Sequence, residues 1–521
     1  MKKKVILINL PPTSRYDYSA AGTLYPATGL LAVGTILKGL DIDVRLVDGA
    51  IRSDYAEEAL GLIGDDVLMV GFSVMTSQVP MALYMSRLIK EKRPVVPIVW
   101  GGIHPILFPE QTVKSDYVDI VVTGEGHRAT MELVDHLLGR MDIDRIKGIG
   151  FKDVSGEAVL TGQGESDDIN ALPHFDYSIL GDSEIYLGSR SVYSREIAVD
   201  NGEKVRIMPV LTGLGCCYKC QFCINVFLKR KYRFRPASSI IGEIKKLQRR
   251  YRANAFIFYD EDFLISKQRL LEFLDLIEKE GLKFYWRIWA RVNYFRENYL
   301  TKDLILRMEK TGLRSIVMGA ESGSQKVLDL IEKGIKVDSI PYSARLLNGT
   351  KITPRYSFIV GINGENKDDT LKTYKLCGDI MDINRRVDIA GPFIFRYYPG
   401  SPIFDKIVES YNIEIPRRLE DWRGALSNEG FLRMDKMPWL WPGFTGTVVF
   451  LNDELQLLSR FQGVGGIFGG LVKRYLRWRI KSSCQIFPVE IYVFNFMRAV
   501  YHKYSNFKAR QRGGPAREGV V

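Results

Sequence analysis

Short apolar runs alternate with amphipathic runs through most of this 521-residue chain. Apolar runs of about five to seven residues predict buried strands, and apolar positions three and four apart predict helices. The first group of strands is expected at 5–10, 43–49, 67–73, 96–102 and 120–126, with helices over 27–40, 81–92 and 129–139. Because buried strands that alternate with helices form parallel sheets covered on both faces, residues 1–145 predict a doubly wound, Rossmann-like α/β domain.

A second group of strands follows a polar linker over 146–205. The apolar runs lie at 207–213, 255–260, 284–291, 315–321, 356–361 and 389–398, and amphipathic runs separate them. Six strand–helix repeats predict a partial (β/α)6 TIM-type barrel over 206–405, whose site belongs at the carboxyl ends of the strands. The alternation ends there, and 406–521 is expected to be a mainly helical, basic C-terminal region.

Composition and charge narrow the class of protein. Hydrophobic residues make up 46% of the chain and charged residues 26%, which is typical of globular domains. The start MKKKVILINLPP is interpreted as a first strand rather than a signal peptide, so a cytoplasmic location is expected. The net charge is +12, of which the residues from Arg460 onward carry +10, leaving a nearly neutral body.

The cysteines give the first chemical indication. Four of the six lie within GLGCCYKCQFC at residues 213–223, too close together for a disulfide framework. Cys216, Cys220 and Cys223 have C-x3-C-x2-C spacing, which suits three irons of a [4Fe-4S] cubane and leaves the fourth iron open. Zinc is the alternative, but no second pair of cysteines or histidines completes a four-ligand set. Cys217 is interpreted as a bystander.

The chain resembles the radical S-adenosylmethionine (SAM) superfamily from the cysteine motif onward. The motif is followed in order by KYRFRP, YDEDF, WARVN, MGAESGS, FIVGING and YYPGSP. The N-terminal part resembles the cobalamin-binding domains of one branch of that superfamily, in PPTSR, FSVMTSQ, WGGIHPILFPE and TGEGHRATMEL. The resemblance covers roughly residues 1–405 and implies three cofactors, namely a [4Fe-4S] cluster, SAM and cobalamin.

The resemblance also implies roles for residues at the barrel rim. Glu321 would accept hydrogen bonds from SAM, and the alternative is an exposed carboxylate at the start of a helix. Arg291 would offset negative charge, and the alternative is a structural ion pair. The other implied residues are Phe222, Ile359 and Gly361 for adenine packing, Asp260 and Asp262 for SAM contacts, and Tyr397 as a catalytic candidate.

Small and hydroxyl residues after the first strands would line the cobalamin site. They are Ser73, Thr76, Gly101, Gly102, Gly124 and Gly126, and Glu125 is a further candidate for cofactor binding. The D-x-H-x-x-G pattern of binders that replace the cofactor's base with histidine is absent; His104 is a candidate to approach the corrin, with loop packing as the alternative. A different Rossmann ligand is the alternative for the whole domain, although no G-x-G-x-x-G follows the first strand.

The resemblance implies that the chain is a radical SAM enzyme, but two reactions stay open. One is methylation of an unactivated carbon of a small-molecule or lipid substrate, and the other is oxidative cyclisation as in the anaerobic cyclase of chlorophyll synthesis. An electron donor such as flavodoxin or ferredoxin is an expected partner. A tRNA methylthiotransferase would need further cysteines in its N-terminal domain, and none precedes Cys216, which argues against a nucleic-acid substrate. A sensor without turnover would not need the SAM-contacting rim.

The basic tail has two interpretations. GGLVKRYLRWRIK at 469–481 places Lys473, Arg474, Arg477, Arg479 and Lys481 among Leu471, Tyr475, Leu476, Trp478 and Ile480. Such a segment fits a peripheral contact with an anionic membrane surface. The alternative is a solvated helix packed on the barrel.

Overall fold

The computed structural model describes residues 2–11, 26–164, 166, 168–181, 183–187, 197, 204–426, 437–462 and 466–482. The described chain forms two compact units. The first comprises Met1–Ala290, Leu306–Ile316 and Arg396–Pro438, and the second comprises Arg291–Ile305, Val317–Phe395 and Trp439–Val521. Most of the PPTSR segment, Cys484 and the basic tail beyond 482 lie outside the described residues.

The N-terminal sheet has seven strands in the order β2-β1-β3-β4-β5-β6-β7. The first five are parallel neighbours: β1 (Lys4–Asn9), β2 (Asp43–Asp48), β3 (Val67–Ser73), β4 (Ile98–Gly101) and β5 (Ile120–Val122). In this order β1 is the strand where the winding reverses, and β1 is buried along its centre because VILI faces helices on both sides. The doubly wound fold is confirmed.

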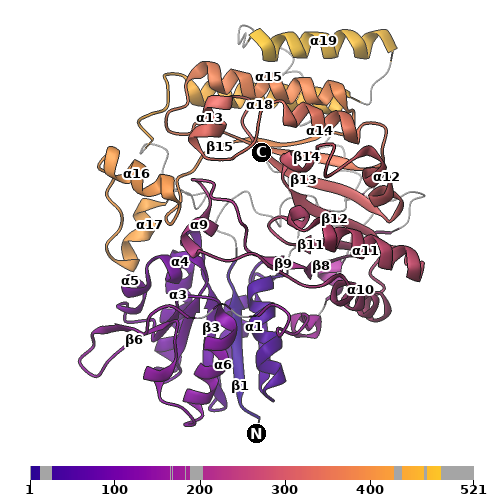
Figure 1. The fold of residues 1–521 in the computed structure, drawn as a ribbon. Coiled ribbons are helices and arrows are strands. Elements are labelled where there is room, and N and C mark those ends of the chain that lie inside the picture. Colours follow the sequence, from indigo (N-terminus) through magenta and orange to yellow (C-terminus); the bar gives the residue numbers. More distant parts are fainter. Residues whose placement is uncertain are drawn as a thin grey trace, which may run out of the picture. The chain divides into compact units, whose positions relative to one another are not determined.

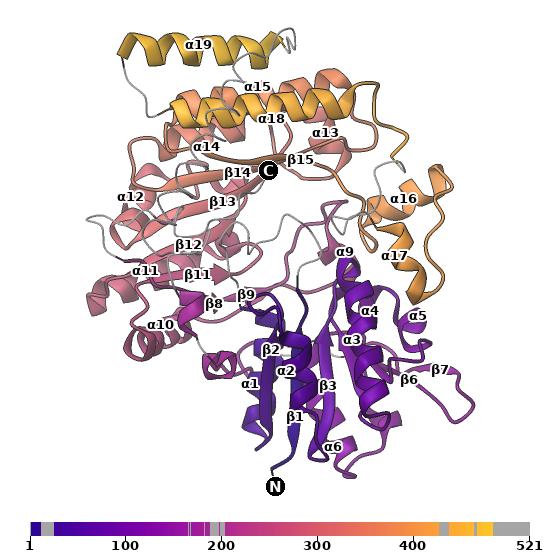
Figure 2. The ribbon, with the colours of Figure 1, turned by 180° about the vertical axis from the view of Figure 1, so that it is seen from behind.

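Two layers of helices cover this sheet. Helices α1 (Thr28–Gly39) and α6 (Gly126–Leu137) contact each other on one face, and α2 (Tyr55–Leu62) and α3 (Val79–Lys92) contact each other on the opposite face (Figures 1 and 2). Two short helices, α4 (Ile103–Leu107) and α5 (Pro109–Val113), follow β4. The core between α1, α6 and the sheet is built from Leu, Ile and Val side chains such as Leu7, Leu37 and Leu133.

The sheet extends past the boundary that the sequence suggested. Strand β6 (Ile149–Lys152) pairs antiparallel with β5, and β7 (Ala158–Leu160) pairs antiparallel with β6 at the edge of the sheet. The hairpin turn Asp153–Gly156 is closed by a 3.0 Å backbone hydrogen bond, which lets a polar-looking segment return along the sheet. The first part of the expected linker therefore belongs to the N-terminal sheet, and η3 (Tyr177–Leu180) and α7 (Glu184–Leu187) follow it.

The second sheet has six strands in the order β15-β14-β13-β12-β11-β8, so that each strand adjoins the next one in the sequence. The strands are β8 (Ile207–Leu211), β11 (Ala255–Tyr259), β12 (Tyr285–Ala290), β13 (Leu313–Glu321), β14 (Thr353–Val360) and β15 (Asp388–Ile394). The pairs β8–β11, β11–β12 and β14–β15 are parallel. All six strands lie where the apolar runs predicted them.

Helices separate these strands as expected for a (β/α) repeat. They are α10 (Ala237–Tyr251), α11 (Lys267–Glu280), α12 (Lys302–Lys310), α13 (Gln325–Leu330), α14 (Ser339–Leu347) and α15 (Lys367–Ile383). A short hairpin of β9 (Gly213–Leu214) and β10 (Arg233–Phe234), with α9 (Ile224–Leu228) between its strands, interrupts the repeat after β8. This hairpin carries the cysteine motif.

The C-terminal region is helical where it is described. The first unit contains α16 (Pro402–Ser410) and α17 (Trp422–Ala425). In the second unit, α18 (Phe444–Phe461) and α19 (Gly466–Ser482) pack with α15, and α19 is the outermost of the three (Figures 1 and 2). Within the described ranges, no helix has both the length and the apolar character needed to cross a membrane.

Candidate functional site

The cysteine motif lies in a loop held by a backbone hairpin. Arg233 of β10 pairs with Leu214 of β9, so residues 215–232 form a loop whose two ends lie side by side. Gly215 begins the loop with a φ of +81°, and a Cβ there would lie 2.6 Å from the carbonyl oxygen of Lys231. Only glycine fits that approach. The backbone N–H of Cys223 donates to the carbonyl of Cys220 at 3.0 Å, which forms a turn inside the motif.

The structure brings Cys216, Cys220 and Cys223 into this one loop. Cys220 is buried, Cys216 and Cys223 are half-buried, and Cys217 is exposed. Phe222 is half-buried beside them. Within the described residues, no three His, Cys, Asp or Glu side chains are gathered as ligands of a single metal ion. The remaining described cysteine, Cys377 of α15, is fully buried, and burial raises the pKa of its thiol well above the usual value.

The YYPGSP motif packs against this loop. Gly400 has a φ of +85°, and a Cβ there would lie 2.6 Å from Cδ1 of Ile224. The N–H of Ile403 donates to the carbonyl of Gln221 at 3.0 Å, between two cysteines of the motif. Tyr397 is buried and stacks on Phe404 with ring centroids 5.9 Å apart. The chain after β15 thus supports the cysteine loop in the first unit.

Asp260, at the end of β11, has an internal partner. Its carboxylate pairs with the guanidinium of Arg269 at 2.9 Å, and both side chains are fully buried. The hydroxyl of Thr212 donates to it at 3.4 Å, and the N–H of Asp262 donates at 3.2 Å. Burial raises the pKa of Asp260, and the adjacent Arg269 acts in the opposite direction.

These contacts differ from the SAM contact expected for Asp260. A Cβ at Gly213 would lie 2.4 Å from an oxygen of Asp260, so the carboxylate fills the space beside β9. Arg269 also donates to the carbonyls of Thr212 and Phe263 at 3.1 and 2.8 Å. The observed role of Asp260 is to join β11 and α11 to the hairpin of the cysteine motif, and Asp262 is likewise buried. A SAM contact by either residue stays a prediction.

The residues expected to line the cobalamin site lie at or just after the ends of β3, β4 and β5, which are adjacent parallel strands. His104 is buried, and the other candidates are half-buried, namely Ser73, Thr76, Gly101, Gly102, Gly124, Glu125 and Gly126. A Cβ at Gly124 would meet no heavy atom within 4 Å, so this glycine borders open space. Gly102, in contrast, has a φ of +96° and would clash with the backbone of Val74 at 2.6 Å. Gly102 therefore shapes the loop.

His104 is completely buried. Its Nδ1 lies 3.3 Å from the hydroxyl of Thr76, and its ring packs edge-on against Trp422 with centroids 5.2 Å apart. Its Nε2 is buried and has no hydrogen-bond partner among the described residues. Burial lowers the pKa of His104 to about 3, so the imidazole is neutral at physiological pH. The structure shows loop packing; an approach to the corrin stays a prediction.

Trp422, from the C-terminal region, packs against the N-terminal domain. Its indole N–H donates to Oε1 of Gln111 at 2.7 Å, and Nε2 of Gln111 donates to the carbonyl of Pro416 at 2.7 Å. The ring is fully buried between His104 and Phe108. Sequence reasoning missed this contact because a single tryptophan 300 residues away gives no local signal.

Glu125 connects the N-terminal domain to the cysteine hairpin. Its carboxylate takes two hydrogen bonds from the guanidinium of Arg233, one of 3.0 Å, and lies 3.9 Å from Arg230. The side chains of Glu125 and Arg233 are 9% and 17% exposed, so water screens the pair weakly. The predicted cofactor contact of Glu125 is untested, and its observed partner is the strand that returns from the cysteine loop.

In the second unit, Glu321 ends β13 in an unusual conformation. Its φ is +62°, in the left-handed region that non-glycine residues seldom occupy. Its carboxylate pairs with the ammonium of Lys333 at 2.7 Å, and both side chains are 8% exposed. A Cβ at Gly319 would lie 2.2 Å from the Glu321 carboxylate, so glycine is needed beside the pair. Arg291 donates to the carbonyl of Lys333 and to the Asn293 side chain at 3.3 Å.

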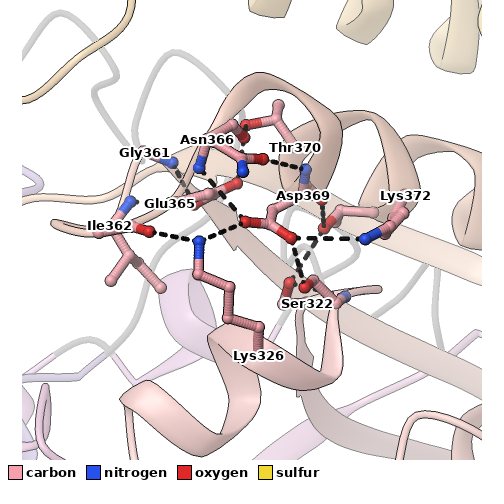
Figure 3. A network of polar contacts seen from close by, with 12 residues as sticks. Ser322, Lys326, Gly361, Ile362, Glu365, Asn366, Asp369, Thr370 and Lys372 are labelled. Carbon is pink, nitrogen blue, oxygen red and sulfur yellow. Dashed lines mark hydrogen bonds and ion pairs between the residues drawn. The ribbon is translucent and has the colours of Figure 1, made fainter.

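A polar network connects the segment that follows Glu321 to the turn after β14 and to the start of α15. The hydroxyl of Ser324 donates to Asp369 at 2.7 Å. The ammonium of Lys326 pairs with the same carboxylate at 3.0 Å (Figure 3). Asn366 and Asp369 form a reciprocal cap at the start of α15. The network fixes the MGAESGS segment against α15.

Gly361 is held by this turn. Its N–H donates to Oε2 of Glu365 at 2.8 Å, and Thr370 donates to the other oxygen at 2.7 Å (Figure 3). Burial raises the pKa of Glu365. A Cβ at Gly361 would lie 2.7 Å from the ring of Phe444, so that face is covered by protein. Ile359, on β14, is half-buried. Adenine packing at these two positions remains a prediction.

Comparison with known proteins agrees with this architecture. The Radical SAM superfamily model matches residues 210–377, and the B12 binding domain model matches residues 18–134. The chain is 26% identical over 444 residues to the anaerobic magnesium-protoporphyrin IX monomethyl ester cyclase of Rubrivivax gelatinosus, covering 79% of this chain and 76% of the cyclase.

Two solved structures share the fold at 16% sequence identity. The cobalamin-dependent S-adenosylmethionine radical enzyme OxsB aligns with a TM-score of 0.66 over 92% of this chain and 71% of OxsB. The radical S-adenosylmethionine methyltransferase TsrM from Kitasatospora setae aligns with a TM-score of 0.63 over 93% of this chain and all of TsrM. The chain is therefore a cobalamin-dependent radical SAM enzyme, of the family that includes both methylases and a cyclase.

Proposed function

We propose that this enzyme transfers a methyl group to an unactivated carbon of a small-molecule, lipid-like substrate. The observation that carries the proposal is the succession of a B12-binding domain and a radical SAM region in one chain. TsrM, a methyltransferase, shares the fold along its whole length. Oxidative cyclisation is the second candidate, because the Rubrivivax gelatinosus relative is a cyclase.

The cysteine loop provides the donor set that a [4Fe-4S] cluster needs. Three thiols lie within eight residues, on a hairpin that is fixed at both ends, with two of them partly accessible. Cys216, Cys220 and Cys223 would hold three irons and leave the fourth for SAM. A bound cluster supplies the electron that cleaves SAM reductively. The chain's own contribution is to hold the loop still through Gly215, Asp260 and Arg269.

The Glu321–Lys333 pair suits the amino-acid end of SAM. SAM carries an ammonium and a carboxylate, and a buried pair of opposite charges offers a partner to each. Glu321 would accept hydrogen bonds from the ammonium or the ribose hydroxyls, and Lys333 would hold the carboxylate. Arg291 would keep Lys333 in position through its bond to the Lys333 carbonyl.

The ends of β3, β4 and β5 would hold cobalamin. Ser73 and Thr76 offer hydroxyls, and Gly124 leaves room for a cofactor to lie against the backbone. His104 does not have to ligate the metal in this proposal. Its imidazole instead joins the loop after β3 to the loop after β4, which keeps the floor of the site rigid.

The test uses protein purified and reconstituted anaerobically with iron, sulfide and cobalamin. With SAM and a strong reductant we expect 5′-deoxyadenosine, and we expect label from the methyl group of SAM to enter an apolar fraction of cell extract. Formation of 5′-deoxyadenosine without methyl transfer, accompanied by oxidation of the substrate, would favour the cyclase alternative. No 5′-deoxyadenosine at all would contradict both candidates.

A further inference from the structure

Helix α19 is anchored to the second unit by one face. Leu476, Arg479 and Ile480 are at most 2% exposed and face α18 and α15. The guanidinium of Arg479 lies 5.1 Å from the ring of Phe450 and 3.7 Å from the fully buried carboxylate of Glu454. Burying a charge is costly without a partner, so this ion pair fixes the rotation of the helix about its axis.

The opposite face of α19 is apolar and exposed. Ile467, Leu471, Tyr475 and Trp478 are 86%, 58%, 42% and 52% exposed, respectively. Their spacing of four, four and three residues places them in one stripe along roughly 16 Å of helix. The rings of Tyr475 and Trp478 lie 6.0 Å apart, which confirms that they share a face. A continuous apolar stripe of this kind marks an interaction surface in a soluble protein.

Charge identifies the occupant of this surface. The helix has no acidic residue, and Arg474 and Lys481 are exposed beside the stripe. A second copy would bring the same cations face to face. Residues 483–521 also carry an excess of four positive charges, with six Lys and Arg against Glu490 and Glu518. An anionic lipid surface complements both the cations and the aromatic stripe, since Trp and Tyr favour the boundary between apolar and wet regions.

We propose that the exposed face of α19 docks this enzyme on an anionic membrane surface, with the helix lying in the plane of the interface. Ile467, Leu471, Tyr475 and Trp478 enter the acyl boundary, and Arg474 and Lys481 contact lipid phosphates. Docking of this kind would give the enzyme access to a lipid-like substrate. Membrane docking through α19 requires neither the iron–sulfur cluster nor cobalamin.

The test measures binding of the full-length protein to phosphatidylcholine vesicles with and without phosphatidylglycerol. We expect binding only to the anionic vesicles. The double substitution Leu471→Glu with Trp478→Glu should weaken binding by at least about tenfold, because apolar burial is lost and two repelling charges are added. The control is Val449→Glu, which changes an exposed apolar residue of α18 and should bind like the wild type.

Two further measurements separate the other occupants. Brominated lipid should quench a fluorescence component that is absent from Trp478→Phe, which reports insertion even if the double variant folds poorly. Light scattering gives the oligomeric state; a dimer abolished by the double substitution would show that a second copy covers the stripe and would overturn the proposal. Equal binding to neutral and anionic vesicles, or no loss in the double variant, would also overturn it. Because apoprotein suffices, failure here is distinguishable from failure of the catalytic proposal.

Discussion

The ion pair between Glu125 and Arg233 gives the sharpest mechanical prediction, because it joins the B12-binding domain to the hairpin of the cysteine loop. Substituting Arg233→Met removes the two hydrogen bonds that the guanidinium donates to the Glu125 carboxylate, while Arg230 stays 3.9 Å away. Charged hydrogen bonds contribute about 1.5–3 kcal/mol each when neither partner is left exposed. Two such bonds would contribute about 3–6 kcal/mol, but the pair is 9% and 17% exposed and Arg230 stays nearby, so we expect the free energy of unfolding to fall by about 2–3 kcal/mol.

Glu125→Gln should cost less, about 1–2 kcal/mol, because the amide oxygen still accepts a hydrogen bond. The double variant should be less destabilised than the sum of the single variants, with a coupling energy of at least about 1 kcal/mol. Urea unfolding of the apoprotein gives these values. The matched control is Glu91→Gln, which breaks an exposed ion pair with Arg87 within α3 and should cost about 0.5 kcal/mol or less.

Hydrogen exchange tests the link to the cysteine loop directly. The amides of Leu214 and Arg233 should exchange faster in Arg233→Met than in the wild type, while those of β1 should not change. A coupling energy near zero, or unchanged exchange in the hairpin, would refute the reasoning that this pair holds the loop to the B12-binding domain.

Two other predictions concern groups buried inside the units. The pKa of His104 falls from 6.5 to about 3 on folding, so protonation between those values favours the unfolded chain. The free energy of unfolding should therefore drop by about 1 kcal/mol from pH 6.5 to 5.5. In urea unfolding, His104→Asn should lose this pH dependence, and an identical slope in the variant would count against a buried neutral imidazole. Gly319→Ala would place a methyl group against the Glu321–Lys333 pair and should lower the free energy of unfolding by about 1–3 kcal/mol, measured by thermal melting. The control is Gly242→Ala, where a Cβ meets nothing within 4 Å and the substitution should be neutral or stabilising. Equal effects at the two glycines would show that the space beside the pair is not crowded.

The apolar runs and their alternation with helices were sufficient to predict both sheets, because the central strands are buried and therefore rich in apolar residues. They could not place β6 and β7, since short edge strands carry a mixed pattern and depend on the β5 edge for pairing. The C-x3-C-x2-C motif located the cysteine loop because its ligands are close in sequence. The partners of individual side chains were not predictable: Arg269 for Asp260, Lys333 for Glu321 and Trp422 for His104 are each set by tertiary packing.

The roles of the residues expected at strand ends were likewise not predictable from the sequence. A carboxylate after a strand is equally compatible with a cofactor contact and with an internal ion pair, and sequence spacing does not distinguish them. Asp260 is the clear case, because its partner Arg269 lies on the following helix and both are fully buried. Burial and partners separate the two possibilities, and only the folded chain provides them.

The central claim is that three thiolates of one loop hold a cluster with an open iron for SAM. Mössbauer and electron paramagnetic resonance spectra of anaerobically reconstituted protein test it most directly. The claim predicts one [4Fe-4S] cluster whose reduced-state signal changes when SAM is added, and which is lost when Cys216, Cys220 and Cys223 become alanine but retained in Cys217→Ala. A cluster that survives the triple substitution, or a signal that SAM leaves unchanged, would contradict it.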